Sequence, residues 1–160
     1  MEQLTEILKR LHDAKVEFSL IGGFAARHHG VTLVTEDVDV CARFSPENLR
    51  RLEAAFKDVH PRHRLTVNKV PFELTDELCR SLKNIYLQTD LGVLDCLSQV
   101  TGLGDFDSVV QQSEMIEFPF GHCYVLKIGA LIQAKKAVGR PHDLIAASQL
   151  DAIQEKRGQK

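Results

Sequence analysis

Two aspartates lie two positions apart in an otherwise apolar stretch, Asp37-Val38-Asp39-Val40. Successive side chains of a strand point to opposite faces, so the two carboxylates share one face while Val38 and Val40 enter the core. With a rise of about 3.3 Å per residue, their Cα atoms lie roughly 6.6 Å apart, a spacing from which both can lean onto metal ions about 3.5–4 Å apart. Without a cation they would repel, and the pKa of one would rise. The pattern favours magnesium, which takes hard oxygen ligands; the alternative is an ordinary solvated strand face.

A glycine pair precedes this strand. The run Val16–Ile21 predicts a first strand that ends at Gly22-Gly23, and Phe24–His29 predicts a short helix after it. Residues without a Cβ would let phosphate oxygens approach the backbone N–H groups at the start of that helix, whose positive end favours anions. Taken alone, the pair is also what a plain turn requires.

Further elements must hold these residues in place. Leu4, Ile7, Leu8 and Leu11 recur at helical spacing, and Ser45-Pro46-Glu47 is a strong helix start. The expected elements are helices over residues 3–14, 46–57, 75–82, 106–112, 128–138 and 141–155, and strands over residues 37–44, 84–90, 93–97, 115–118 and 123–126. This order predicts one mixed α/β or α+β domain with helices at both ends and strands between them.

Composition limits the classes of function. The chain has 160 residues, is 44% hydrophobic and 26% charged, and carries a formal net charge of −2. These values predict a globular domain with an ample core and no global attraction to nucleic acid or to anionic membranes. No apolar run is long enough to cross a bilayer, and the N-terminus predicts a polar helix rather than a signal peptide. The four cysteines are widely spaced, which predicts reduced thiols and a cytoplasmic protein.

Three motifs in order suggest a family. Gly22-Gly23, a gap of thirteen residues and Asp37-Val38-Asp39-Val40 resemble the signature of the polymerase-β-like nucleotidyltransferase superfamily. Leu94-Asp95-Cys96 is similar to its third acid between apolar neighbours, and the run Lys135–Asp143 resembles the end of its small minimal members, which include uncharacterised and abortive-infection toxin–antitoxin proteins. The resemblance implies an α+β fold: a mixed sheet with helices packed on one side and C-terminal helices, in a single domain over residues 1–160.

The same resemblance implies roles for individual residues. The chain would be an enzyme that moves a nucleoside monophosphate from a nucleoside triphosphate (NTP) to a hydroxyl, with two Mg²⁺ ions. Asp37, Asp39 and Asp95 would be catalytic and hold the metals, and Asp95 could also act as general base for the acceptor hydroxyl. The residues assigned to nucleotide binding are Gly22, Gly23, Thr35, Lys127 and Lys135. The acceptor could be a small molecule, a tRNA end or a protein side chain. Separately from the resemblance, a domain of 160 residues leaves little room for a large acceptor pocket, so a homodimer or a protein partner could supply part of it.

Two positions depart from the family pattern. Gly23 stands where a serine hydroxyl often contacts phosphate, and Leu33 stands where many small relatives carry a basic residue. Lys127, Lys135 and Arg140 are the candidates to replace that charge. The departures favour a second hypothesis, a non-catalytic domain of the same fold that binds a nucleotide or a protein, as an antitoxin or regulatory subunit would. A third is a structural dimer without a ligand.

A basic segment lies between the second and third motifs. Arg62, Arg64 and Lys69 could contact a polynucleotide, but no aromatic residues alternate with them to stack bases, so a solvated face is the stronger interpretation. His60 and His63 have the spacing of half a zinc site, yet no second pair completes it, and we expect a solvated loop there.

Overall fold

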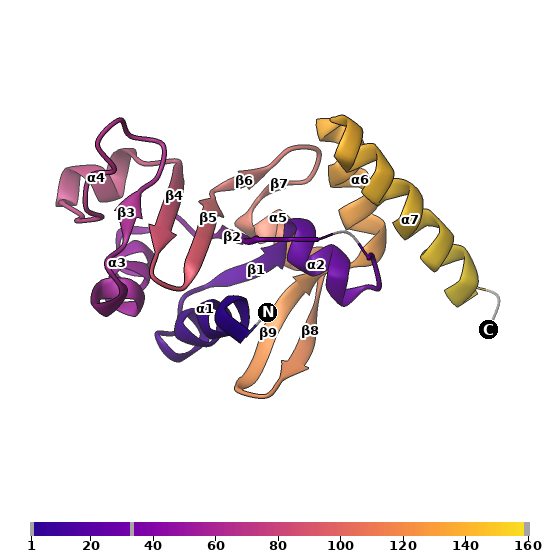
Figure 1. Cartoon of the computed structure of the whole chain (residues 1–160), viewed down its shortest axis with the longest axis horizontal. Coiled ribbons are helices and arrows are strands. Elements are labelled where there is room, and N and C mark those ends of the chain that lie inside the picture. Colours follow the sequence, from indigo (N-terminus) through magenta and orange to yellow (C-terminus); the bar gives the residue numbers. More distant parts are fainter. Residues whose placement is uncertain (1, 33, 159–160) are drawn as a thin grey trace.

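The computed structural model describes residues 2–32 and 34–158 (Figure 1). The helices are α1 (Glu2–Asp13), α2 (Gly22–His28), α3 (Pro46–Phe56), the 3-10 turn η1 (Lys57–Val59), α4 (Asp76–Ser81), α5 (Phe106–Gln111), α6 (Ile128–Val138) and α7 (Pro141–Gly158). The strands are β1 (Phe18–Ile21), β2 (Asp37–Ala42), β3 (Arg62–His63), β4 (Asn84–Thr89), β5 (Gly92–Leu97), β6 (Gln99–Val100), β7 (Gly104–Asp105), β8 (Ser113–Phe118) and β9 (Gly121–Leu126). The α+β class is therefore confirmed.

A seven-stranded mixed sheet organises the molecule. Its order is β3-β4-β5-β2-β1-β9-β8, and β6 and β7 pair separately. The pairs β2–β5 and β1–β9 are parallel, whereas the other neighbours are antiparallel. The hairpin expected between strands 84–90 and 93–97 forms from β4 and β5. The other edge of β5 pairs in parallel with β2. This topology brings the third motif next to the second.

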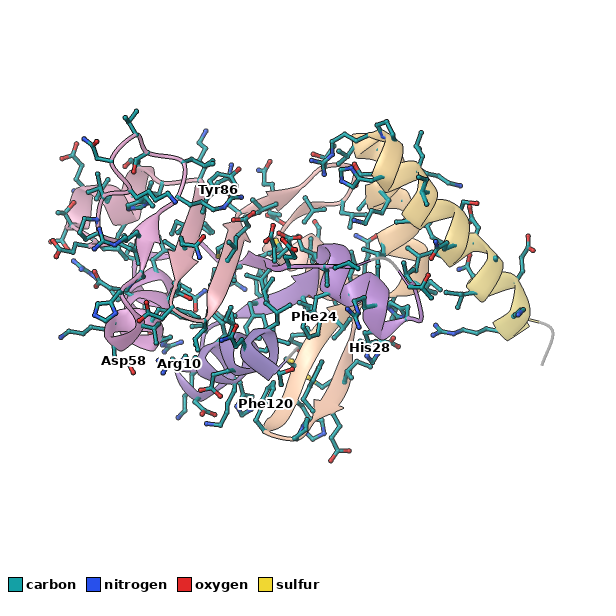
Figure 2. The ribbon with its side chains drawn as sticks, in the orientation of Figure 1. Arg10, Phe24, His28, Asp58, Tyr86 and Phe120 are labelled. Atoms are coloured by element: carbon teal, nitrogen blue, oxygen red, sulfur yellow. The ribbon has the colours of Figure 1, made fainter. Side chains whose placement is uncertain are left out.

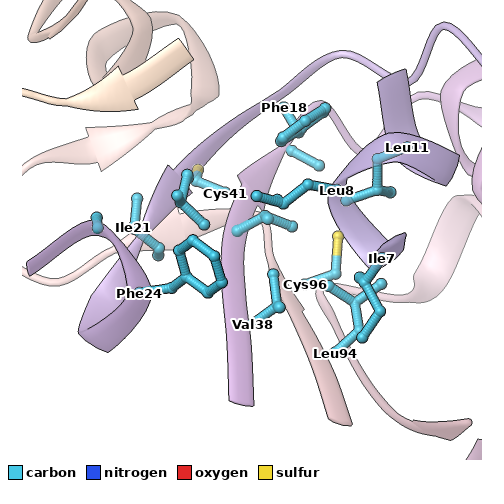
Figure 3. Close-up of a cluster of buried hydrophobic side chains, with 14 of the residues drawn as sticks. Ile7, Leu8, Leu11, Phe18, Ile21, Phe24, Val38, Cys41, Leu94 and Cys96 are labelled. Carbon is cyan, nitrogen blue, oxygen red and sulfur yellow. The ribbon is translucent and has the colours of Figure 1, made fainter. Parts of the chain in front are cut away.

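One face of the central strands is covered by α1. Leu8 and Leu11 are fully buried, and they pack with Val38 of β2 and with Leu94 and Cys96 of β5 (Figure 3). Alternation along β2 and β5 then places Asp37, Asp39 and Asp95 on the opposite face.

The two ends of the molecule differ. The helices α3 and α4 lie with β3 and β4 at one end, and α6 and α7 pack against each other at the other end (Figure 1). Helix α3 begins as the sequence predicts, because Ser45 accepts a hydrogen bond from the Asn48 N–H at 3.2 Å with Pro46 at the first helical position. None of the helices in residues 2–32 and 34–158 combines the length and apolar character that a membrane span needs.

Candidate active site

The three predicted acids lie on adjacent strands. Asp39 of β2 and Asp95 of β5 are direct partners in the parallel register, and Asp37 is two residues before Asp39 on the same face. Neighbouring strands lie about 4.8 Å apart, so the sheet itself brings the carboxylates of Asp39 and Asp95 together. Residues separated by 56 positions in the sequence thus form one cluster.

Burial and mutual repulsion act on two acids of this cluster. Burial raises the pKa of Asp39 to about 6, and the charges of Asp95 and Asp37 add to the effect. The pKa of Asp37 is also raised, first by burial and then by the charge of Asp95. The charge of Asp95 therefore makes both Asp37 and Asp39 harder to ionise, which is the electrostatic condition that a bound cation relieves.

A guanidinium already lies at the third acid. Arg64 donates from Nε to Oδ1 of Asp95 at 3.0 Å and from Nη2 to Oδ2 at 2.5 Å, a bidentate pair. The Arg64 side chain is 28% exposed and that of Asp95 only 12%. The guanidinium carbon also lies 5.4 Å from the ring centroid of Tyr86, which is labelled on β4 in Figure 2. The expectation that Arg64 belongs to a solvated face is wrong, whereas Arg62 and Lys69 are exposed as expected.

The glycine pair packs against acidic and polar side chains. Gly22 has a φ of +71°, and a Cβ placed there would overlap Oδ2 of Asp39. A Cβ at Gly23 would lie 2.9 Å from Oγ1 of Thr35. Thr35 is fixed in turn by donating a hydrogen bond to the carbonyl oxygen of Asp37 at 3.1 Å. The absent side chain of Gly22 therefore makes room for the Asp39 carboxylate, a role distinct from the approach of phosphate oxygens that the sequence predicts.

Two cavities meet at the carboxylates. The larger, of about 610 Å³, is named cavity A and is lined in part by Gly23, Thr35 and Asp37. The smaller, of about 350 Å³, is named cavity B and is lined in part by Gly22 and Tyr86. The residues shared by both walls are Asp39, Arg64, Asp95, Lys135 and Arg140. Two of the three acids, Asp39 and Asp95, and three cations thus form the partition between the two cavities, whereas Asp37 lines cavity A alone.

A buried aspartate holds two of these cations. Asp143 is 1% exposed and accepts from Nε of Arg140 at 2.7 Å, while Nζ of Lys135 lies 3.7 Å from its other oxygen. Burial opposes ionisation of Asp143, but the hydrogen bond and charge of Arg140 together with Lys135 hold its pKa below the ordinary value. The left-handed Gly139 at the end of α6 makes the turn that places Arg140 beside Lys135.

Lys127, which the sequence assigns to nucleotide binding, lies away from the acids. Lys127 is the exposed N-cap residue of α6, its N–H donates to the carbonyl oxygen of Gln112 at 2.9 Å, and it lines neither cavity A nor cavity B. Leu33 lies outside the described residues. Sequence reasoning missed Arg64 and Asp143 as members of the site, although Asp143 belongs to the run that carries the family resemblance.

The donor set suits a hard divalent cation. Asp37 and Asp39 supply carboxylate oxygens on one face, and Asp95 adds two more once its pairing with Arg64 is loosened. As the side chains stand, the described part of the chain contains no group of three or more His, Cys, Asp or Glu residues placed to hold a metal ion. Binding a cation here would therefore require the three carboxylates to turn toward one another, and Asp95 to loosen its pairing with Arg64.

Comparison with solved structures shows a recurring fold. The lincosamide antibiotic adenylyltransferase LnuA, solved with lincomycin bound, is 14% identical with a TM-score of 0.64 over 95% of this chain and 96% of its own. The enzyme ANT(2")-Ia, solved with adenylyl-2"-tobramycin, is 17% identical with a TM-score of 0.55 over 99% and 96% of the two chains. TM1012 from Thermotoga maritima, assigned as a nucleotidyltransferase, is 17% identical with a TM-score of 0.56 over 98% and 91%.

At such identities the likeness shows the fold, which is that of the nucleotidyltransferases. No protein-family model matches the sequence, and no curated protein sequence matches it either.

Proposed function

We propose that this chain is a metal-dependent nucleotidyltransferase that moves a nucleoside monophosphate from an NTP to a hydroxyl acceptor. The observation that carries the proposal is the cluster of Asp37, Asp39 and Asp95, of which Asp39 and Asp95 lie at the partition between cavities A and B and Asp37 lines cavity A. Transfer at phosphorus needs the attacking and leaving oxygens on opposite sides of the phosphorus atom. A site open to two adjoining spaces meets that requirement.

The two cavities suit the two substrates. Cavity A has room for a nucleotide, and Lys135 and Arg140 at its wall would bind phosphate oxygens. Cavity B combines a polar end with an apolar wall that includes Leu97 and Val138, which suits the body of a small hydroxyl compound. We assign the acceptor to cavity B, in line with the small antibiotic substrates that the solved adenylyltransferases of this fold bind.

The residues of the chain would act as follows. Asp37, Asp39 and Asp95 would hold two Mg²⁺ ions, which when bound neutralise the charge that develops on the phosphate oxygens. Asp95 would accept the proton of the acceptor hydroxyl as that oxygen attacks the α-phosphorus. Lys135 and Arg140 would hold the departing pyrophosphate. Asp143 would keep these two side chains in place through its ion pairs with them.

The test of this proposal is transfer itself. Each α-labelled NTP is incubated with Mg²⁺, the protein and either candidate hydroxyl compounds or a cell extract, and products are separated by mass. We expect transfer with the unaltered chain, loss with Asp39→Asn, and retention with Glu155→Gln, which alters an exposed carboxylate on α7. Equal transfer by the unaltered chain and Asp39→Asn would refute the metal role.

A second candidate is a nucleotide-binding domain without catalysis. The bidentate pair favours it, because Arg64 donates to both carboxylate oxygens of Asp95, the residue proposed as the general base. In that case nucleotide with Mg²⁺ would raise the melting temperature by mass action, but no labelled product would form. An antitoxin or regulatory role would further require a partner protein that co-purifies with the chain. Membership of the toxin–antitoxin branch stays a prediction.

A further inference from the structure

Arg64 is carried by a segment that closes on itself. The two ends of residues 61–72 are joined by backbone hydrogen bonds, from the N–H of Phe72 to the carbonyl oxygen of Pro61 at 2.9 Å and from the N–H of His63 to that of Val70 at 2.8 Å. The tip beyond Arg64 is in solvent, where Val67 is fully exposed. The base of this segment is therefore fixed, its tip is exposed to solvent, and Arg64 lies between the two.

The backbone and the side chain of Arg64 are held separately. Its N–H donates to the carbonyl oxygen of Tyr86 at 3.0 Å, which continues the pairing of β3 with β4. Its guanidinium donates hydrogen bonds to both carboxylate oxygens of Asp95 and lies over the Tyr86 ring. The side chain can therefore leave Asp95 by rotating about its own bonds, without unpairing the strand.

The contact between Arg64 and Asp95 is also an electrostatic one that involves all three acids. The hydrogen bonds to Asp95 raise the pKa of Arg64, and the charges of Asp95, Asp37 and Asp39 act in the same direction. The guanidinium thus lies in the field of all three acids. A divalent cation drawn to the same field would be repelled by a fixed guanidinium a few ångströms away.

We propose that Arg64 is the resident counter-ion of Asp95 and competes with the divalent cation for that carboxylate. This inference rests on the proposed function, because it concerns the same carboxylates. In the cation-free protein, Arg64 neutralises Asp95 and keeps its carboxylate in place. When the cation binds, the guanidinium moves off Asp95 but stays within the partition between cavities A and B, both of which it lines.

A purely structural salt bridge makes a different prediction. If the pair only ties residues 61–72 to β5, then replacing Arg64 lowers stability and leaves cation affinity unchanged or weaker. If Arg64 competes, its replacement strengthens cation binding, even though one favourable contact has been lost.

The experiment measures binding of Mn²⁺ alone by titration calorimetry at neutral pH, so it does not depend on catalysis. We expect the dissociation constant of Arg64→Gln to be at least about tenfold lower than that of the unaltered chain, equal to about 1.4 kcal/mol. Arg64→Lys keeps the charge but loses the two-point geometry, and it should fall between them. The matched control is Arg62→Gln, because the Arg62 side chain donates to the Lys69 carbonyl oxygen at 3.3 Å and to no carboxylate among residues 2–32 and 34–158, so its replacement should leave the affinity unchanged.

A double variant tests whether the gain in Mn²⁺ affinity acts through Asp95. Adding Asp95→Asn to Arg64→Gln should abolish the gain, because the competition acts at Asp95. Should Arg64→Gln fail to fold by circular dichroism, Arg64→Lys carries the comparison alone. Mn²⁺ binding gained by an Arg64 variant supports the inference even if the unaltered chain binds too weakly to measure.

No tighter binding in either Arg64 variant would overturn the inference. The proposed function fails separately, through absence of transfer in the labelled-NTP assay.

Discussion

Replacing Asp39 by asparagine should stabilise the cation-free protein. The folded chain holds a proton on Asp39 more tightly than the unfolded chain, because burial and two neighbouring carboxylates raise its pKa to about 6 from an ordinary value near 3.8. That difference corresponds to about 3 kcal/mol of unfolding free energy that is lost when Asp39 ionises. The amide side chain of the variant has nearly the same shape and no charge, so it avoids this cost.

The pH dependence follows from the sign of the shift. Below about pH 3, Asp39 is protonated in both the folded and the unfolded chain, and the variant gains nothing. As the pH rises toward 6, the unfolded chain ionises first, and the cost to the unaltered protein grows; above about pH 6.5 it is nearly complete. The gain of Asp39→Asn should therefore grow with pH to a plateau of about 3 kcal/mol.

The measurement is urea unfolding in chelator at several pH values between about 4 and 8, which span the range over which the gain should grow. For a chain of this length, the plateau corresponds to a rise in melting temperature of about 6–12 °C. Glu155→Gln removes an equal charge from an exposed site on α7 and should change stability by less than about 0.5 kcal/mol at every pH. A destabilised Asp39→Asn at neutral pH would refute the electrostatic account of the cluster.

Three substitutions test the surrounding structure. Gly22→Ala should destabilise the fold by more than about 1 kcal/mol in urea unfolding, because the left-handed backbone and the contact with Asp39 both oppose a Cβ; wild-type stability would contradict this. Asp143→Asn should cost about 3 kcal/mol and raise the KM for NTP more than it lowers kcat, since two cations at the cavity wall lose their buried partner; an unchanged KM would leave Asp143 a structural residue. Ser45→Ala should cost about 1 kcal/mol of unfolding free energy by removing the cap on Asn48, without any effect on nucleotide affinity.

Local patterns predicted the main elements well. The helix expected over residues 128–138 is α6, and the strand expected from Asp37 begins there and ends at Ala42 rather than at residue 44. Apolar spacing also placed Val38 and Val40 in the core, which is confirmed, since both are fully buried. These features succeed because each depends on residues that are neighbours in the sequence.

The missed features depend on contacts between distant segments. Strands β3, β6 and β7 have two residues each, too short for any periodicity to indicate them. The partner of Arg64 lies 31 positions away, and the pairing of β3 with β4 and of β4 with β5 brings the two residues together. Basic residues in an irregular segment look alike in sequence, so nothing local distinguished Arg64 from the exposed Arg62.

The same electrostatics that destabilise the empty cluster make it responsive to a cation. A ligand at about one hundred times its dissociation constant stabilises the folded state by about 2.7 kcal/mol, close to the cost assigned to ionised Asp39. The unaltered chain with saturating Mg²⁺ and the cation-free Asp39→Asn chain should therefore reach similar stability at neutral pH by different routes. Only the unaltered chain should lose that stability when chelator is added. If the cation instead stabilised both chains equally, it would be bound elsewhere, and the carboxylates on β2 would owe their raised pKa values to burial without any role in metal binding.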